Sequence, residues 1–233
     1  MVFELGSTKS VRLAGRRPTV LVPLGSTEQH GPHLPLDTDT RIATAVAAAA
    51  VLELGTGTLL APAISYGSSG EHQAFPGTIS VGTDALSSLL VEYGRSASYW
   101  AKRLIFVNGH GGNVAALSAA VPGLRAEGRD VAWFGCAVPG ADAHAGHTET
   151  SLLLHLCPEQ VGSYGGVRGN TESLAALMGR LRTGGMAAVS QSGVLGDPSN
   201  ANAEAGQRYL NVMVGDCVHR TRRWRPAPSG LLT

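Results

Sequence analysis

A short stretch near the N-terminus concentrates side chains that commonly bind metal ions. Residues 25 to 39 read GSTEQHGPHLPLDTD. Glu28 and His30 are two residues apart, so their side chains point the same way in an extended segment. Asp39 can fold back toward them after two prolines. Because burying three such groups without a partner is costly, we expect Glu28, His30 and Asp39 to bind metal.

The chemistry of these ligands narrows the choice of ion. Carboxylate oxygens and imidazole nitrogens without sulfur suit Zn, Mn or Fe(II). Two other polar residues of the segment have structural explanations. Asp37 is expected to cap the Ala-rich helix that follows, a role that Asp39 could also fill, and His33 to support the loop.

A second cluster is the sequence NGHGGN at residues 108–113, which follows an apolar run. Such a glycine-rich turn could cradle a phosphate, but it lacks the GxGxxG pattern and the lysine of a P-loop. His110 is therefore expected to be a metal ligand. Asn108 and Asn113 would brace the turn, and Gly111 and Gly112 would leave room for substrate or allow positive φ angles.

A third cluster, HAGHTETS, spans residues 144–151. Glu149 falls in an expected first helical turn, where a carboxylate is favoured without any function. The structural alternative is a cap by Thr148 with Glu149 in solvent. Beside the other two clusters, however, this segment supplies a fifth ligand, Glu149, and a general acid or base, His144.

A fourth segment, residues 68–78, contains the adjacent pair Glu71 and His72. Adjacent side chains face apart in an extended chain, so the two are expected to line the mouth of a pocket. A structured loop with a supporting histidine is the alternative. His155 and His219 lie in helical stretches and are expected to be core or surface residues.

Strand-like runs alternate with helical ones along the chain. The expected strands are Thr19–Leu24, Thr58–Ala63, Arg103–Val107 and Asp130–Cys136. The expected helices are Thr40–Leu54, Thr83–Lys102, Val114–Glu127, Thr148–Leu156, Thr171–Leu181 and Ala201–Arg222. Short Val-, Ile- and Leu-rich strands are typical of a parallel sheet buried on both faces. The pattern predicts a single domain, residues 1–233, that is a three-layer α/β/α sandwich with a mostly parallel sheet.

The polar clusters follow strands of this expected sheet. In open α/β folds, ligands bind at the carboxyl ends of the strands. The clusters are therefore expected to meet at one edge of the sheet. The chain from residue 225 onward, with two prolines, is expected to be a loose tail.

Composition excludes several classes of protein. The net charge of +1 argues against a nucleic-acid partner. No apolar stretch is long enough to span a membrane, and the N-terminus lacks the pattern of a secretory signal. Three scattered cysteines indicate neither disulfides nor a thiolate metal site, which favours the cytoplasm. The low charged fraction, 15%, suggests a homo-oligomer.

The strings GSTEQHGPHLPLDTD, EHQAFPGTIS, NGHGGN and HAGHTETS resemble the creatininase family of metal-dependent amidohydrolases. The resemblance implies a creatininase-like fold, a hexamer-like homo-oligomer and a site with two divalent metal ions. Glu28 and His110 would bind one ion, His30 the other, and Asp39 would bridge them. Creatininase itself has a glutamate where this chain has Gly112, and Glu149 is the candidate replacement.

Within the family, the sequence is most similar to the mycofactocin-system branch, peptidases that trim a modified ribosomal peptide. Creatininase has a tryptophan four residues before the histidine that matches His144, where this chain has Gly140. The resemblance therefore implies cleavage of a modified peptide, with release of its C-terminal fragment, and His144 as proton donor to the leaving amine. The alternatives are a cyclic-amide or formamide hydrolase and a metal-dependent binding protein without turnover.

Overall fold

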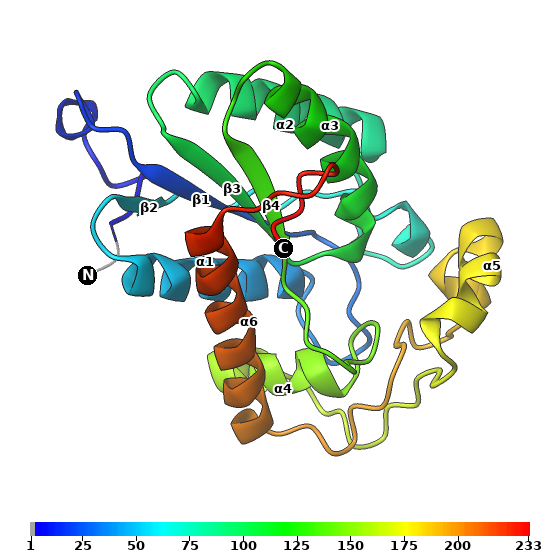
Figure 1. Ribbon diagram of the computed structural model, residues 1–233. Helices are drawn as coiled ribbons and strands as arrows, with labels where there is room; N and C mark the ends of the chain where they lie inside the picture. Colours follow the sequence, from blue (N-terminus) through cyan, green and yellow to red (C-terminus); the bar gives the residue numbers. More distant parts are fainter. Residues whose placement is uncertain (1–2) are drawn as a thin grey trace.

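Four parallel strands form the centre of the fold (Figure 1). The computed structural model describes residues 3–233. The strands lie in the order β2-β1-β3-β4. Their bounds are β1 Thr19–Leu24, β2 Thr58–Leu60, β3 Arg103–Asn108 and β4 Val131–Gly135. The three-layer α/β/α sandwich and the parallel sheet are both confirmed.

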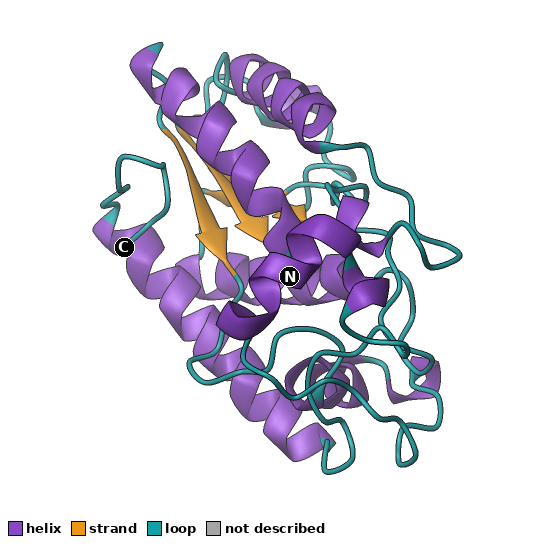
Figure 2. Cartoon of the chain, turned by 90° about the vertical axis from the view of Figure 1, so that its right-hand side faces the viewer, coloured by secondary structure: helices purple, strands orange, loops and turns teal. Residues whose placement is uncertain are grey.

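Helices cover both faces of the sheet, as Figure 2 shows from the side. Their bounds are α1 Thr38–Leu54, α2 Thr83–Ala97, α3 Val114–Ala126, α4 His147–Leu156, α5 Leu174–Gly184 and α6 Ala203–Arg223. Side chains of β1 alternate between the two faces. Val20 and Val22 pack in the core beneath α2 and α3, and Leu21 packs in the core with α1, α4 and α6. Burial on both faces explains the continuous apolar sequence of the strands.

Several element boundaries differ from the sequence expectation, and three of them have a local cause or continuation that the structure shows. The second strand ends at Leu60, because Pro62 has no N–H to donate to a ladder. Helix α2 ends at Ala97, and a short turn then leads into β3. Helix α5 begins at Leu174, because the Ser173 hydroxyl accepts a hydrogen bond from the N–H of Ala176.

Helix α5, which comes between α4 and α6 in the sequence, lies in a small lobe away from the sheet and from those two helices (Figure 1). Leu177 is the one fully enclosed apolar side chain of α5, and it packs with Met186, Val189 and Leu195. This small core holds the lobe together. The lobe therefore has its own packing, separate from the two cores that flank the sheet.

The C-terminal segment is not a loose tail, and the sequence expectation was wrong here. The N–H of Trp133 donates to Gly230 and the N–H of Leu232 donates to Trp133, at 3.0 and 2.9 Å. The Trp133 indole also donates to the Ser229 carbonyl. Strand β4 is an edge of the sheet, so its unpaired backbone groups are available to bind this segment. Leu232 is thereby completely buried.

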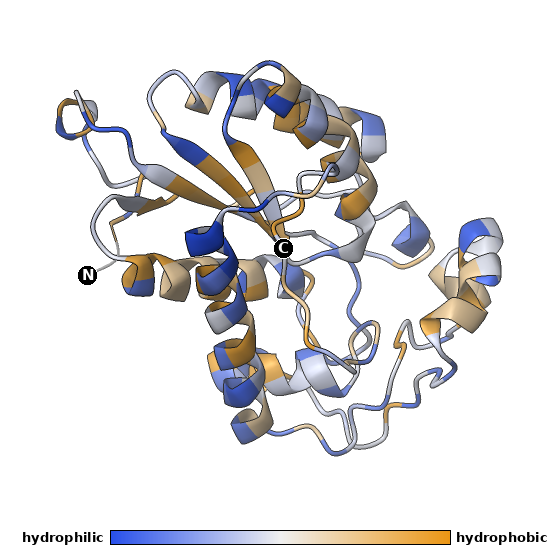
Figure 3. Cartoon of the chain, viewed as in Figure 1, coloured by the Kyte–Doolittle hydropathy of each residue, from blue (hydrophilic) through white to orange (hydrophobic). Residues whose placement is uncertain are grey.

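The distribution of hydropathy agrees with this architecture. Figure 3 shows apolar residues along the strands and hydrophilic residues at the C-terminal end of α6. Between residues 3 and 233, no helix combines the length and the apolar character needed to cross a bilayer.

The buried tail gives a stability prediction. Leu232→Ala removes a fully enclosed side chain and should lower the free energy of unfolding by about 2–5 kcal/mol. Denaturant titration measures this loss, and Thr233→Ala, at an exposed neighbour, should leave the midpoint nearly unchanged. Equal midpoints for both variants would show that the tail does not contribute to stability.

Candidate metal centre

The sheet brings the polar clusters together at one edge. Glu28 and His30 follow β1, His110 follows β3, and His144 follows β4. All four side chains are buried, and Glu28 and His30 are completely inaccessible. The carboxyl ends of neighbouring parallel strands therefore form the site, as expected for an open α/β sheet.

Three of the buried histidines share one arrangement, in which a ring nitrogen meets a backbone carbonyl. The pairs are His30 Nδ1 with Glu28 O at 3.1 Å, His110 Nε2 with Ser68 O at 3.0 Å and His144 Nε2 with Gln29 O at 2.9 Å. A carbonyl oxygen only accepts, so each of these nitrogens must carry the hydrogen. The opposite nitrogen of each ring is then left with a lone pair that can bind a cation.

Asp39 lies between two of these rings. Its Oδ1 is 3.2 Å from His30 Nε2, and its Oδ2 is 3.2 Å from His110 Nδ1. A single donor, the Ser26 hydroxyl, reaches Oδ2 at 2.7 Å. Lone pairs therefore face lone pairs on both sides of the carboxylate. Such contacts are stable only with a proton or a metal ion between the two atoms.

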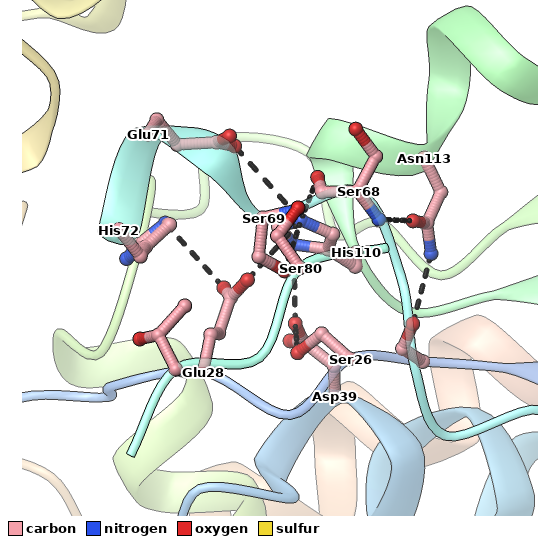
Figure 4. Close-up of polar contacts among 12 residues, drawn as sticks. Ser26, Glu28, Asp39, Ser68, Ser69, Glu71, His72, Ser80, His110 and Asn113 are labelled. Carbon is pink, nitrogen blue, oxygen red and sulfur yellow. Dashed lines mark hydrogen bonds and ion pairs between the residues drawn. The ribbon is translucent and has the colours of Figure 1, made fainter. Parts of the chain in front are cut away.

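Glu28 is the second buried carboxylate (Figure 4). Its two oxygens lie 3.4 Å from His72 Nε2 and 3.2 Å from His110 Nε2, yet neither accepts a hydrogen bond. Burial raises the pKa of Glu28 to about 7. An enclosed carboxylate without a donor is the polar group that a bound cation would satisfy.

The neighbouring pKa values show how strongly the site attracts positive charge. Burial lowers the pKa of His30 and of His110, but the carboxylates of Asp39 and Glu28 outweigh it and raise each to about 10. Burial, with the charge on His110 and His30, lowers the pKa of His72 to about 3. In the protein alone, two protons thus compensate the carboxylates, and metal ions would replace them.

Glu149 reaches the site from the first turn of α4. Ala145 adopts a φ of 51°, and its N–H donates to Glu149 Oε2 at 2.6 Å. This oxygen is 3.9 Å from His30 Nε2. The backbone N–H groups at the helix start are bound by Asp142 instead of a Thr148 side chain. The alternative of a solvated Glu149 capped by Thr148 is therefore wrong.

The side chains form three overlapping groups of possible ligands among the described residues. They are Glu28 with Asp39 and His110, His30 with His144 and Glu149, and Glu28 with His72 and His144. Each group places three ligand atoms within 4.8 Å of one another. The donor set of the first two groups, joined by Asp39, fits two divalent ions. The third group includes His72, which is buried and also lines the cleft over the centre.

A cleft of about 1220 Å³ opens over this centre. Its wall includes Glu71, His72, Gly111 and Gly112. Glu71 projects from a 3-10 helix, Gly70–His72, toward His110 Nε2 at 3.9 Å (Figure 4).

The expected room for substrate at Gly112 is not there. A Cβ at this position would lie 2.2 Å from the Ser68 carbonyl oxygen, so glycine here permits close packing of the backbone. A Cβ at Gly111, by contrast, would meet nothing within 4 Å. Neither residue has a positive φ.

Residues around the ligands hold the loops in place. Asn113 accepts from the Ser68 N–H and donates to Gly25 O and to the Asn108 side chain, which confirms the expected bracing of this turn. His33 contacts the Thr150 hydroxyl at 2.8 Å, as a loop support would.

Asp37 occupies the N-cap position of α1, but its side chain does not bond to the helix backbone. It pairs with Arg41 at 2.7 Å instead, which corrects the capping expectation.

Sequence reasoning missed Gln29. Its Oε1 accepts from the Gly31 N–H at 2.8 Å, which fixes the orientation of the amide. Its Nε2 then donates to His72 Nδ1 at 2.8 Å and to Gly193 O at 3.1 Å. With Nδ1 accepting, the hydrogen of the neutral His72 ring is on Nε2, which faces Glu28 Oε1 at 3.4 Å without forming a hydrogen bond. Flanked by two ligand-type residues, Gln29 carried no signal of its own in the sequence.

Comparison with known proteins agrees with these features. The family model described as creatinine amidohydrolase (Creatininase) matches residues 4–220. A mycofactocin precursor peptide peptidase of Mycobacterium tuberculosis is 58% identical, over 100% of this chain and 96% of its own length. A crystal structure of creatinine amidohydrolase matches with a TM-score of 0.79 at 24% identity, covering 97% of this chain and 99% of that one. A structure of a manganese creatininase matches with a TM-score of 0.74 at 23% identity, covering 97% and 100%.

The position of Asp39 gives a direct test of metal binding. Asp39→Asn removes the charge between His30 and His110 and should strongly reduce the metal content measured by elemental analysis after loading. Asp37→Asn, two residues away at an exposed ion pair, is the matched control and should bind metal like the parent protein. Equal metal content in both variants would contradict the proposed centre.

Proposed function

The chain belongs to the creatininase family, and we propose that it is a metal-dependent peptidase that cleaves one amide bond near the C-terminus of a modified precursor peptide. The proposed product is the modified C-terminal fragment, as in mycofactocin biosynthesis. One observation carries the proposal. The mycofactocin precursor peptide peptidase is similar along the whole chain, including all the segments that build the buried centre.

The ligand sets support a centre of two divalent ions, with Zn, Fe(II) and Mn as the candidates. Glu28, Asp39 and His110 would bind one ion, and His30, Asp39 and Glu149 the other. Glu149 would thus supply the carboxylate that Gly112 lacks. When bound, such ions lower the pKa of a water molecule to about 7 and polarise an amide carbonyl.

His144 is the proposed proton carrier. Its Nε2 is committed to the Gln29 carbonyl, so Nδ1 faces the centre, 3.9 Å from Glu28 Oε1. Burial, together with His30 and His72, holds the pKa of His144 well below its usual range. The ring is therefore neutral at rest and can accept a proton from the attacking water at Nδ1. The same proton can then pass to the leaving nitrogen.

The shape of the cleft favours a peptide over a small ring. Positions Gly111 and Gly140 leave open space where larger side chains would narrow the cleft. A small cyclic amide needs close walls to be held in attack geometry. Glu71, His72, Gly111 and Gly112 line the wall and are the proposed contacts of the substrate near the scissile bond.

A cyclic-amide hydrolase is the second candidate, supported by the fold that the chain shares with creatinine amidohydrolase. The ions and the proton carrier would act on a cyclic amide or on a peptide bond alike. The shape of the cleft therefore decides which of the two substrates is cleaved. A binding protein without turnover is less well supported, because every expected ligand is present in the site. The homo-oligomer expected from the composition and the hexamer-like ring that the family resemblance implies both stay predictions.

The substrate prediction separates these functions. Metal-loaded protein should release the C-terminal fragment of a modified precursor peptide, detected by mass spectrometry, and should turn over creatinine poorly or not at all. The reaction should stop after chelation, which serves as the control. Rapid creatinine hydrolysis with an untouched peptide would replace the peptidase proposal with the second candidate.

The proposed roles of His144 and Glu149 predict different metal contents for the two variants. His144→Ala should retain both ions and lower kcat by about 10²–10⁴-fold, because it removes only the proton carrier. Glu149→Gln should lose about one ion per chain, because it removes a ligand of the second site. Loss of an ion from His144→Ala would instead make His144 a ligand, as its proximity to His30 and Glu149 permits.

A further inference from the structure

One face of α5 forms a wall of the cleft that the proposed chemistry does not use. Leu174, Met178, Leu181 and Arg182 all line the cleft. Their spacing of four, seven and eight residues places them on one side of a helix. Leu177, on the neighbouring face, is buried in the small core of the lobe, and half-buried Leu181 packs against that core as well as lining the cleft. Helix α5 is thus anchored on one side and presents an apolar strip with one cation on the other.

The wall adjoins the metal centre. Gly185, directly after α5, packs so closely on the 3-10 helix at Gly70–His72 that a Cβ there would lie 2.7 Å from Glu71 O. The Glu71 carboxylate in turn lies 3.9 Å from His110 Nε2. A substrate held at the centre can therefore continue along α5 without leaving the cleft.

Arg182 differs from the other charged side chains of the cleft. It is the only arginine or lysine among the residues that line the cleft, and it forms no ion pair within the described part of the chain. Three carboxylates that line the same cleft have partners of their own. Glu172 pairs with Arg180 at 2.6 Å, and Asp142 and Asp197 accept backbone N–H groups. Arg182 is therefore available to bind an external anion.

We propose that α5 binds the peptide substrate beyond the scissile bond, with Arg182 pairing with a carboxylate of the peptide and Leu174, Met178 and Leu181 contacting its apolar side chains. This inference rests on the proposed peptidase function. A guanidinium binds a carboxylate through two parallel hydrogen bonds, which adds orientation to affinity. Charge complementarity and continuity with the centre select a peptide carboxylate as the occupant.

Steady-state kinetics with the metal-loaded protein and the modified precursor peptide tests this role. Arg182→Gln should raise KM about tenfold or more while kcat stays near the parent value, because the contact is remote from the reacting bond. Leu174→Asn, at an exposed position, should raise KM as well. Arg208→Gln is the control, since it removes the same charge from an exposed position on α6, and neither Arg208 nor its partner Glu204 lines the cleft.

Two altered peptides identify the carboxylate. One has an amidated C-terminus, and the other has its acidic side chains replaced by amides. The peptide that lacks the bound carboxylate should show a raised KM with the parent protein and no further increase with Arg182→Gln. If Arg182→Gln and Arg208→Gln give the same KM for the unaltered peptide, the inference is overturned. If the parent protein cleaves no peptide, the proposed function itself fails.

Discussion

The site encloses carboxylates and imidazole lone pairs together, with no donor between them. The rest of the structure depends on this constraint. His30 and His110 each use one nitrogen to bind a backbone carbonyl, and their other nitrogens face Asp39. Lone pairs that face each other at 3.2 Å require a cation between them. The enclosed Glu28 carboxylate, which accepts no hydrogen bond, also requires a cation. The loops that follow three strands must therefore lie close enough together for their side chains to bind the same cations. Gly112 permits part of that approach, because a side chain there would collide with Ser68.

Much of this arrangement could be predicted from the sequence, for a specific physical reason. Apolar runs such as Thr19–Leu24 have few alternatives to a buried strand, so the sheet and its edge follow from pattern alone. The ligand-type residues follow strand ends, and the sheet topology brings them together. The assignment of the ligands to two ions on either side of Asp39 came from the resemblance to creatininase, because residue spacing alone does not predict it.

Other features depend on contacts between segments far apart in sequence. The C-terminal segment contains two prolines that indicate a loop, yet it is ordered by the edge of β4, which local sequence cannot reveal. Two other departures are local: Asp142 binds the backbone at the start of α4 from five and six residues upstream, and Asp37 pairs with Arg41 four residues on. Gln29 acts through His72, more than forty residues away. Side-chain partners of this kind are decided by tertiary packing, which overrides local preference.

The order of these segments along the chain has a consequence for the timing of metal loading. The first group of ligands ends at His110, and Glu149 is added only by α4. Contacts between such distant residues form late, because long loops must close before the contacts stabilise them. In a growing chain the ligands are thus separate at first. Both ion positions are complete only after the helix layer that contains α4 has packed against the sheet. The proposed ions would then be selected by a finished cavity of fixed geometry, and not by the affinity of the nascent peptide for whichever metal is most abundant.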